Sequence, residues 1–260
     1  MNETLVIQSF HAKPWPKTIT RCIDSVQYWA NQKKYYYKLI GDDILGVLPP
    51  KYLHNCFGRW PTITDLARLL LIKKYLNKQI RRVIWIDADV LIFAPRKFNI
   101  KVDEDHLIGR EVWVSKKGRN QWRARKHVHN AFLSFTDSSP LLDFLIFATQ
   151  RIVEKLEVPS SPQIAGPKLY THLNNLIGLP ILESAGMMSP AVMNDLIIGK
   201  GQALNCHLEA LKEPMAAVNL SQSLIDNTID EIPVTHHLFE QTIDVLVNRF
   251  QNSGLEGLIS

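Results

Sequence analysis

The first ninety residues alternate between short β-branched runs and stretches of helical spacing. Thr4–Ser9, Tyr35–Ile40 and Arg81–Ile86 are rich in Val, Ile or Tyr, which is typical of strands. Between these runs, apolar residues recur every three or four positions from Ile19 to Ala30, which predicts a helix after Pro16, and the spacing of Leu66, Leu69 and Leu70 predicts a second helix from Thr62 to Leu76. Strand–helix–strand units imply parallel strands with right-handed crossovers. The chain therefore predicts an α/β fold with a mixed, mostly parallel sheet flanked by helices.

The pattern is looser in the second half of the chain. His106–Val114 and Asn130–Thr136 have the composition of strands, and helices are predicted from Pro140 to Leu156 and from Pro167 to Gly178. Glycines and prolines interrupt residues 179–227, and no element is predicted there. Because no repeat or linker divides the chain, we expect residues 1–260 to form one domain with C-terminal accessory elements.

The composition is that of an ordinary soluble globular protein, with 46% hydrophobic and 21% charged residues. No apolar run approaches the ~20 residues that a bilayer crossing needs. The N-terminus, "MNETLVIQSF", lacks the basic and apolar regions of a secretory leader. Cys22, Cys56 and Cys206 lie far apart, without the spacing of a disulfide framework or a zinc site. We therefore expect reduced thiols and a cytoplasmic location.

Basic residues cluster between Ser115 and His127, and Trp113 and Trp122 flank or interrupt them. Such a mixture can bind nucleic acid, anionic lipid or a phosphorylated ligand, or it can be a solvated loop. The net charge of +5 is mild, and we expect no nucleic-acid partner. Peripheral contact with the inner face of a membrane is compatible with the stretch.

Two aspartates, Asp87 and Asp89, follow the apolar run Arg81–Ile86. Ligands of α/β sheets bind beyond the carboxyl ends of the strands. Side chains two apart on a strand point the same way, so both carboxylates can converge on one hard cation such as Mn²⁺ or Mg²⁺. A substrate diphosphate would supply further ligands. The alternative is that the pair caps a turn through backbone hydrogen bonds.

Three further features accompany this pair. Asp65 and Arg68 are three residues apart on the preceding predicted helix, where they form either an exposed ion pair or part of a site. Asn130, a neutral donor and acceptor, stands at the head of a predicted strand. Gly166 and Pro167 begin a predicted helix, whose N–H groups can meet an anion or simply start the helix.

Together, "TDLARLLLIKKYL", "RRVIWIDADVLIF", "HNAF" and "AGPKL" resemble, in that order, the GT-A-fold glycosyltransferases that carry a DXD motif. The similarity is nearest to the sugar-binding-region group, which includes glycosyltransferase family 32 and the large clostridial glucosylating toxins. In that group a helix with Asp-x-x-Arg precedes a hydrophobic strand that ends in Asp-x-Asp. The resemblance covers residues 4–175 and is most specific between Thr62 and Phe93.

The resemblance implies a metal-dependent, hexosyltransferase-like enzyme that works with retention. It would move a sugar from a nucleotide-diphosphate sugar to a glycan, lipid or protein acceptor. Asp89 would be the principal ligand of Mn²⁺ or Mg²⁺, and Asp87 a metal or ribose contact. Asp65 and Arg68 would hold the donor sugar, and Arg68 can also balance charge on the leaving diphosphate.

The resemblance implies further contacts with the donor. Ser9, Phe10 and His11 would lie near the nucleotide base, and Asn130 near the transferred sugar. The helix start at Gly166 and Pro167 would also bind substrate. The third metal ligand would be His236 or His237 of "PVTHHLF", although either can equally be an ordinary histidine. Residues 1–115 would form the nucleotide-sugar-binding half and residues 116–260 the acceptor-side half.

Three other functions fit some of the same residues. "VIWIDADVLIF" also resembles the first motif of haloacid dehalogenase-like phosphatases, in which Asp87 would be the nucleophile. However, that motif normally lies near the N-terminus and is followed by Thr or Val where Leu91 stands here. A hydrolase with the two aspartates as general acid and base is the second alternative. The third is a non-enzymatic module that binds through the basic stretch, which leaves Asp87 and Asp89 unexplained.

Overall fold

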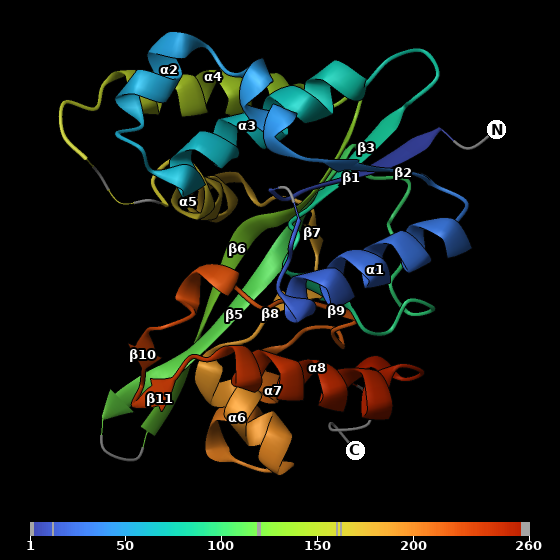
Figure 1. The fold of residues 1–260 in the computed structure, drawn as a ribbon, viewed down its shortest axis with the longest axis vertical. Helices are drawn as coiled ribbons and strands as arrows, with labels where there is room; N and C mark the ends of the chain where they lie inside the picture. Colours follow the sequence, from blue (N-terminus) through green and yellow to red (C-terminus); the bar gives the residue numbers. More distant parts are fainter. Residues whose placement is uncertain (1–2, 12, 119–120, 160, 162, 256–260) are drawn as a thin grey trace.

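The fold is described from a computed structural model that covers residues 3–255 except residues 12, 119, 120, 160 and 162. Its centre is a six-stranded sheet with the strand order β2-β1-β3-β6-β5-β7 (Figure 1). The strands are β1 (Thr4–Ser9), β2 (Tyr36–Ile40), β3 (Arg82–Ile86), β5 (His106–Gly118), β6 (Gln121–Thr136) and β7 (Ile181–Leu182). β1 is parallel to β2 and β3, and β7 is parallel to β5, whereas β6 is antiparallel to both β3 and β5. The predicted mixed, mostly parallel α/β sheet is confirmed.

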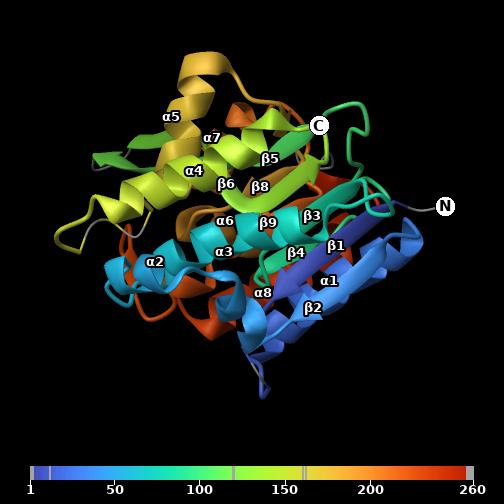
Figure 2. The same cartoon turned by 90° about the horizontal axis from the view of Figure 1, so that it is seen from above.

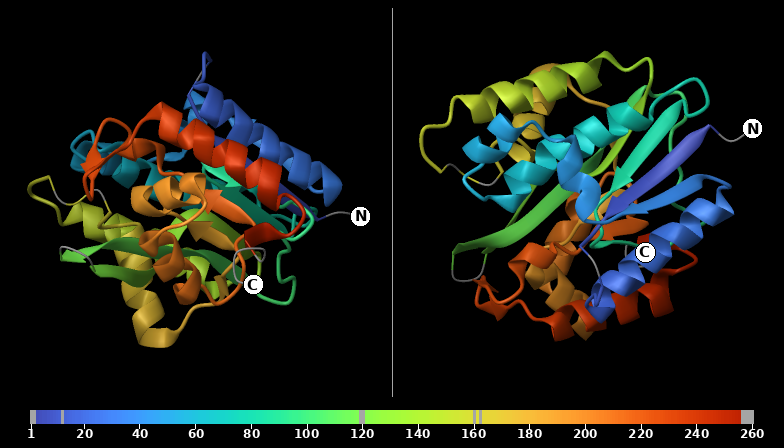
Figure 3. Two further views of the ribbon diagram at one scale, coloured as in Figure 1. Left: turned by 90° about the horizontal axis from the view of Figure 1, so that it is seen from below. Right: turned by 45° about the horizontal axis from the view of Figure 1, so that its top comes forward.

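Helices cover both faces of this sheet (Figures 1 and 3). One face carries α2 (Pro50–Asn55), α3 (Trp60–Tyr75) and α4 (Pro140–Glu154). The other face carries α1 (Lys17–Gln32), α6 (Pro190–Ile198), α7 (Gln202–Ala210) and α8 (His236–Phe250). Figure 2 shows that α5 (Pro167–Ile177) packs beside β6 and projects from the body of the protein.

Alternation along the strands builds two hydrophobic cores. Val6 of β1 and Ile84 of β3 point to the α1 side, whereas Ile7 and Val83 point to the α3 side. A three-stranded sheet of β4 (Val90–Ile92), β9 (Ala217–Asn219) and β8 (Ala185–Met187) joins the core on the α1 side. The remaining elements are the short helices η1 (Asp42–Val47) and η2 (Gln222–Leu224) and the hairpin of β10 (Thr228–Ile229) and β11 (Ile232–Pro233).

The structure corrects one expectation and fills one gap. The basic stretch from Ser115 to His127 is not a loop, because on either side of residues 119 and 120 its residues pair in the β5–β6 hairpin. Residues 179–227, for which no element was predicted, contain β7, β8, α6, α7, β9 and η2. None of the described helices combines the length and the apolar character that a bilayer crossing needs.

Candidate active site

Two cavities meet at Asp87 and Asp89, which line both of them. The smaller cavity, of about 540 Å³, lies among the ends of β1, β2 and β3 and the start of α3. The larger, of about 690 Å³, lies between the β5–β6 hairpin, α5 and the segment of residues 219–224. Two chambers that share a pair of carboxylates can hold two substrates on either side of a reacting centre.

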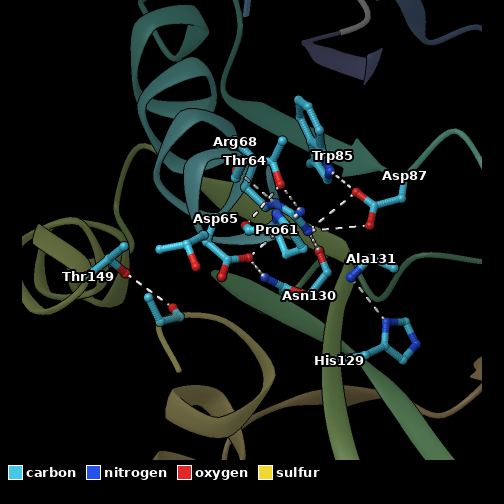
Figure 4. Close-up of polar contacts among 12 residues, drawn as sticks. Pro61, Thr64, Asp65, Arg68, Trp85, Asp87, His129, Asn130, Ala131 and Thr149 are labelled. Carbon is cyan, nitrogen blue, oxygen red and sulfur yellow. Dashed lines mark hydrogen bonds and ion pairs between the residues drawn. The ribbon is translucent and has the colours of Figure 1, made fainter. Parts of the chain in front are cut away.

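Asp87 continues the alternation of β3 toward the α3 side. Its Oδ1 accepts a hydrogen bond from Trp85 Nε1 at 2.6 Å (Figure 4). Its backbone N–H donates to the carbonyl of Ala131 at 2.8 Å. Arg68 Nη1 lies 3.3 Å from Oδ1 and 3.4 Å from Oδ2 of Asp87. The carboxylate is therefore fixed by two donors while a quarter of it, 26%, stays exposed to the cavities.

Asp89 is held by a different part of the chain. β3 ends at Ile86, and the Val90 N–H donates to the Asp87 carbonyl at 3.1 Å, so a turn separates the two aspartates. The expectation that strand alternation aligns their side chains is therefore wrong. Asp89 Oδ2 instead accepts from the backbone N–H of Gln222 at 2.8 Å. Burial, and then the nearby Asp87 carboxylate, raise the pKa of Asp89 to about 6.

The segment that covers Asp89 contains polar residues that the sequence did not single out. Ser221 adopts a positive φ of 57°, and its N–H donates to Asn219 Oδ1 at 2.8 Å. Ser221 lines the larger cavity and is only 6% exposed, and its Oγ has no hydrogen-bond partner among the described residues. This hydroxyl is therefore available to hydrogen-bond a group bound in the larger cavity.

The oxygen atoms around Asp87 and Asp89 are of the kind that bind a hard divalent cation. Asp87 and Asp89 supply carboxylate oxygens to both cavities, and Asn219 and Ser221 supply neutral oxygens to the larger one. Within the described part of the chain, no three His, Cys, Asp or Glu side chains converge on a metal position. The set is thus of the kind that holds Mg²⁺ or Mn²⁺ by one or two carboxylates and leaves further positions to substrate phosphates.

Behind Asp87, Arg68 organises a buried network (Figure 4). Its Nη1 donates to the carbonyl of Asn130 at 2.7 Å and its Nε to the carbonyl of Thr64 at 3.1 Å. Asn130 Nδ2 donates to Asp65 Oδ1 at 2.7 Å. Asp65 is only 3% exposed and lines neither cavity, so the structure places it behind the site rather than against a donor sugar. Its burial raises the pKa of Asp65 to about 7, although Arg68 and Asn130 oppose the shift.

Asn130 reaches this network because β6 bulges beside it. The β5–β6 register steps from Ile108 opposite Leu133 to Gly109 opposite His129, so the residues between them leave the pairing. The His129 ring occupies the space above Gly109, where an added Cβ would lie 2.2 Å from Cε1. His129 Nδ1 accepts from the N–H of Ala131 and Nε2 donates to the Ala185 carbonyl, both at 3.2 Å. Burial lowers the pKa of His129 to about 4, so a neutral ring fixes the bulge.

The other predicted site residues divide between the cavities. Ser9, Phe10 and His11 line the smaller cavity, and Pro167 lines the larger one. Gly166 lines neither, because it packs against the Asp65 carboxylate. His236 and His237 are exposed in the first turn of α8 and line neither cavity. The structure therefore gives no support to the third-ligand role expected of His236 or His237, because neither lines a cavity that Asp87 and Asp89 line.

Each cavity also has aromatic or charged residues that sequence reasoning did not assign. Trp60 and Trp85 line the smaller cavity, whose lining is largely apolar. The larger cavity is lined instead by charged and aromatic side chains: Glu111, Trp113, Arg125, His127, Lys168 and His172. The basic, tryptophan-containing stretch was the signal for Arg125 and His127, but only the strand pairing shows which of its side chains share a face.

Comparisons with protein-family models and with curated protein sequences find no match. Among solved structures, the chain is similar to a glycosyltransferase involved in the glycosylation of the major capsid of PBCV-1, with 8% identity and a TM-score of 0.49. That similarity covers 93% of this chain and 98% of the other. Mouse xyloside xylosyltransferase 1 is similar over 85% of this chain and 98% of its own, with 10% identity and a TM-score of 0.45.

Proposed function

We propose that this protein transfers a sugar from a nucleotide-diphosphate donor to an acceptor, with a divalent cation at Asp87 and Asp89. One observation carries the proposal: a largely apolar, tryptophan-lined cavity and a charged cavity meet at two carboxylates. A nucleotide base is flat and apolar, whereas an acceptor is polar, so the two chambers suit the two substrates of such a transfer. Residues 1–115 supply most of the donor side, and residues 116–260 most of the acceptor side.

The residues have separate roles in this scheme. Asp89 is the principal metal ligand and Asp87 the second, and the bound cation would neutralise charge on the departing diphosphate. Arg68 holds Asp87 in place and adds a fixed positive charge beside the donor cavity. Asp65 and Asn130 position Arg68 from behind. The resemblance to family 32 further favours a hexosyl donor and retention at the anomeric carbon.

The acceptor is a glycan, a lipid or a protein, and peripheral membrane contact would accompany a lipid acceptor. The cytoplasmic location stays a prediction from the free cysteines. The phosphatase alternative has less support, because a nucleophilic Asp87 needs an unencumbered oxygen. Trp85 already donates to one of its oxygens, and Arg68 lies close to both.

Thermal unfolding in the presence of Mn²⁺ and a panel of nucleotide sugars tests the proposal. A ligand that binds only the folded protein raises its stability, and we expect stabilisation by a nucleoside diphosphate or its sugar only when metal is present. Asp89→Asn should lose that stabilisation while keeping the melting temperature of the ligand-free protein. Asp103→Asn, at an exposed position outside both cavities, is the matched control. Metal-independent stabilisation, or turnover of phosphomonoesters, would contradict the proposal.

A further inference from the structure

The β5–β6 hairpin presents one face to the larger cavity. In its register Glu111 lies opposite His127, and Trp113 opposite Arg125. Directly opposed residues of antiparallel strands project from the same face of the sheet. All four side chains line the larger cavity, and α5 adds Lys168 from across it. A row of polar and aromatic groups therefore leads along the hairpin away from the aspartates.

The charged side chains on this face are unpaired in the part of the chain that the structure describes. Among the described residues, the side chains of Glu111, Arg125 and Lys168 make no hydrogen bond or ion pair. By contrast, Lys116, on the hairpin face that packs away from the cavity, pairs with Glu231. Burial raises the pKa of Glu111 to about 7. Arg125 and Lys168 are exposed to solvent at the cavity, whereas Glu111 is half-buried. A charged group that is unpaired and partly desolvated in a cavity, as Glu111 is, is typical of a ligand site.

We propose that this cavity binds a saccharide acceptor that carries an anionic group, with its sugar ring against Trp113 and its anionic group between Arg125 and Lys168. This inference rests on the proposed function, because it identifies the substrate class of the acceptor side. Glu111 and His127 then hydrogen-bond sugar hydroxyls between the tryptophan and the aspartates.

The distribution of charge favours this class of ligand over the others. A flat aromatic face and a carboxyl group match a sugar ring and its hydroxyls, whereas the two cations match a carboxylate, phosphate or sulfate substituent. Glu111 lies in the same cavity, and its carboxylate would repel a polyanion that filled it. An acceptor with its charge at one end and hydroxyls at the other meets both requirements.

A glycan array tests the proposal with labelled protein, both alone and with Mn²⁺ and uridine diphosphate. The array pairs carboxylated, phosphorylated and sulfated glycans with neutral glycans of the same backbone, so the chemistry of the anionic group is read out directly. We expect signal on acidic members and none on their neutral partners. Arg125→Gln and Lys168→Gln should each weaken binding about tenfold or more, as the loss of one charge-assisted contact does.

Two variants complete the design. Arg96→Gln removes an equal charge from an exposed position outside both cavities and should leave the array signal unchanged. Trp113→Ala should weaken binding to every acidic glycan, because the ring platform is lost. Equal binding to neutral partners, no signal on any acidic glycan, or no effect of Arg125→Gln and Lys168→Gln overturns the inference. Tighter binding of a single-stranded RNA or of anionic vesicles through the same two cations also overturns it.

The two proposals fail differently. If nucleotide sugars give no metal-dependent stabilisation but acidic glycans still bind through Arg125, the transferase proposal fails and the saccharide site stands. If nucleotide sugars stabilise the protein but Arg125→Gln leaves glycan binding unchanged, only the acceptor assignment fails.

Discussion

Gly166 lies directly against the carboxylate of Asp65. A Cβ added to Gly166 would stand 2.5 Å from Asp65 Oδ2 and 2.6 Å from Oδ1. Asp65 in turn accepts the side-chain hydrogen bond of Asn130, whose carbonyl accepts from Arg68. The start of α5 is thus linked to Arg68, which holds Asp87, by way of the buried residues Asp65 and Asn130.

This contact predicts that Gly166→Ala displaces Asp65 and disturbs Arg68. Because Asp65 is buried and already hydrogen-bonded, the methyl group should cost about 1–3 kcal/mol, as overpacking of a core does. Urea unfolding measures the loss. Gly46→Ala is the control, since nothing lies within 4 Å of a Cβ added there. Equal stability of Gly166→Ala and Gly46→Ala would show that the α5 start moves freely away from Asp65.

Arg68→Met should be strongly destabilising, because it leaves Asp65 and Asp87 without their cation. Arg68 is 6% exposed, and removal of one partner from a buried ionic network costs about 3–5 kcal/mol. Its interaction with Asp65 needs the ionised carboxylate, so the cost should be larger at pH 8 than at pH 5, on either side of the pKa of about 7.

Denaturant titrations at these two pH values test this prediction. Arg151→Met removes an exposed ion pair to Glu154 and should change stability by less than about 1 kcal/mol. Adding Asp65→Asn to Arg68→Met should recover part of the stability at pH 8. A cost for Arg68→Met that is the same at both pH values would contradict the assigned role of Asp65.

The elements with strong periodicity were predictable from the sequence. β1, α1, β3 and α3 carry clear alternation or helical spacing, and the structure has them within a few residues of the predicted bounds. Asp87 and Asp89 were predicted as site residues from their position alone, since polar residues at the carboxyl end of a buried strand lie at the ligand-binding edge of the sheet. Both line the two cavities, although a turn rather than strand alternation brings them there.

The second half of the site was not predictable in the same way. β8 and β9 are three residues each, too short to produce a periodic pattern, and they pair with segments distant in the chain. Had β9 been recognised, the same rule would have selected Asn219 and Ser221 at its carboxyl end. The burial of Asp65 depends on the bulge beside Asn130 and on Gly166, contacts that no local spacing encodes.

Trp60 should contribute to nucleotide binding and not to stability. It is 59% exposed at the start of α3 and lines the smaller cavity together with Phe10 and Trp85. Stacking of a base on an aromatic side chain is worth about 1–3 kcal/mol, so Trp60→Ala should weaken nucleoside diphosphate binding by about 5-fold to 150-fold.

Calorimetric titration of the nucleoside diphosphate with Mn²⁺ measures the change. Phe147→Ala is the matched control, because Phe147 is 61% exposed on α4 and lines neither cavity. Both variants should unfold at the temperature of the wild-type protein. Unchanged affinity in Trp60→Ala would remove Trp60 from the donor side.

Glu111→Gln should stabilise the protein at neutral and alkaline pH. Burial raises the pKa of Glu111 in the folded protein to about 7, above its ordinary value of 4.5. At pH values between these two pKa values, the folded state binds more protons than the unfolded state. The stability of the wild-type protein therefore falls as the pH rises through this range. Glutamine cannot ionise, and the variant avoids this loss.

The expected signature is a difference in unfolding free energy between Glu111→Gln and wild type that depends on pH. This difference should be constant below about pH 4, where Glu111 is protonated in both the folded and the unfolded protein. It should rise between pH 4.5 and pH 7 and level off above pH 7. A fully buried group would contribute about 1.4 kcal/mol for each unit by which its pKa changes on folding. Because Glu111 is only partly buried, solvent screens its charge, and we expect a smaller total rise of about 1–2 kcal/mol. Urea unfolding across this range measures the curve. A flat difference would mean that water or a cation already compensates the Glu111 carboxylate, which removes the unpaired charge from the acceptor-side cavity.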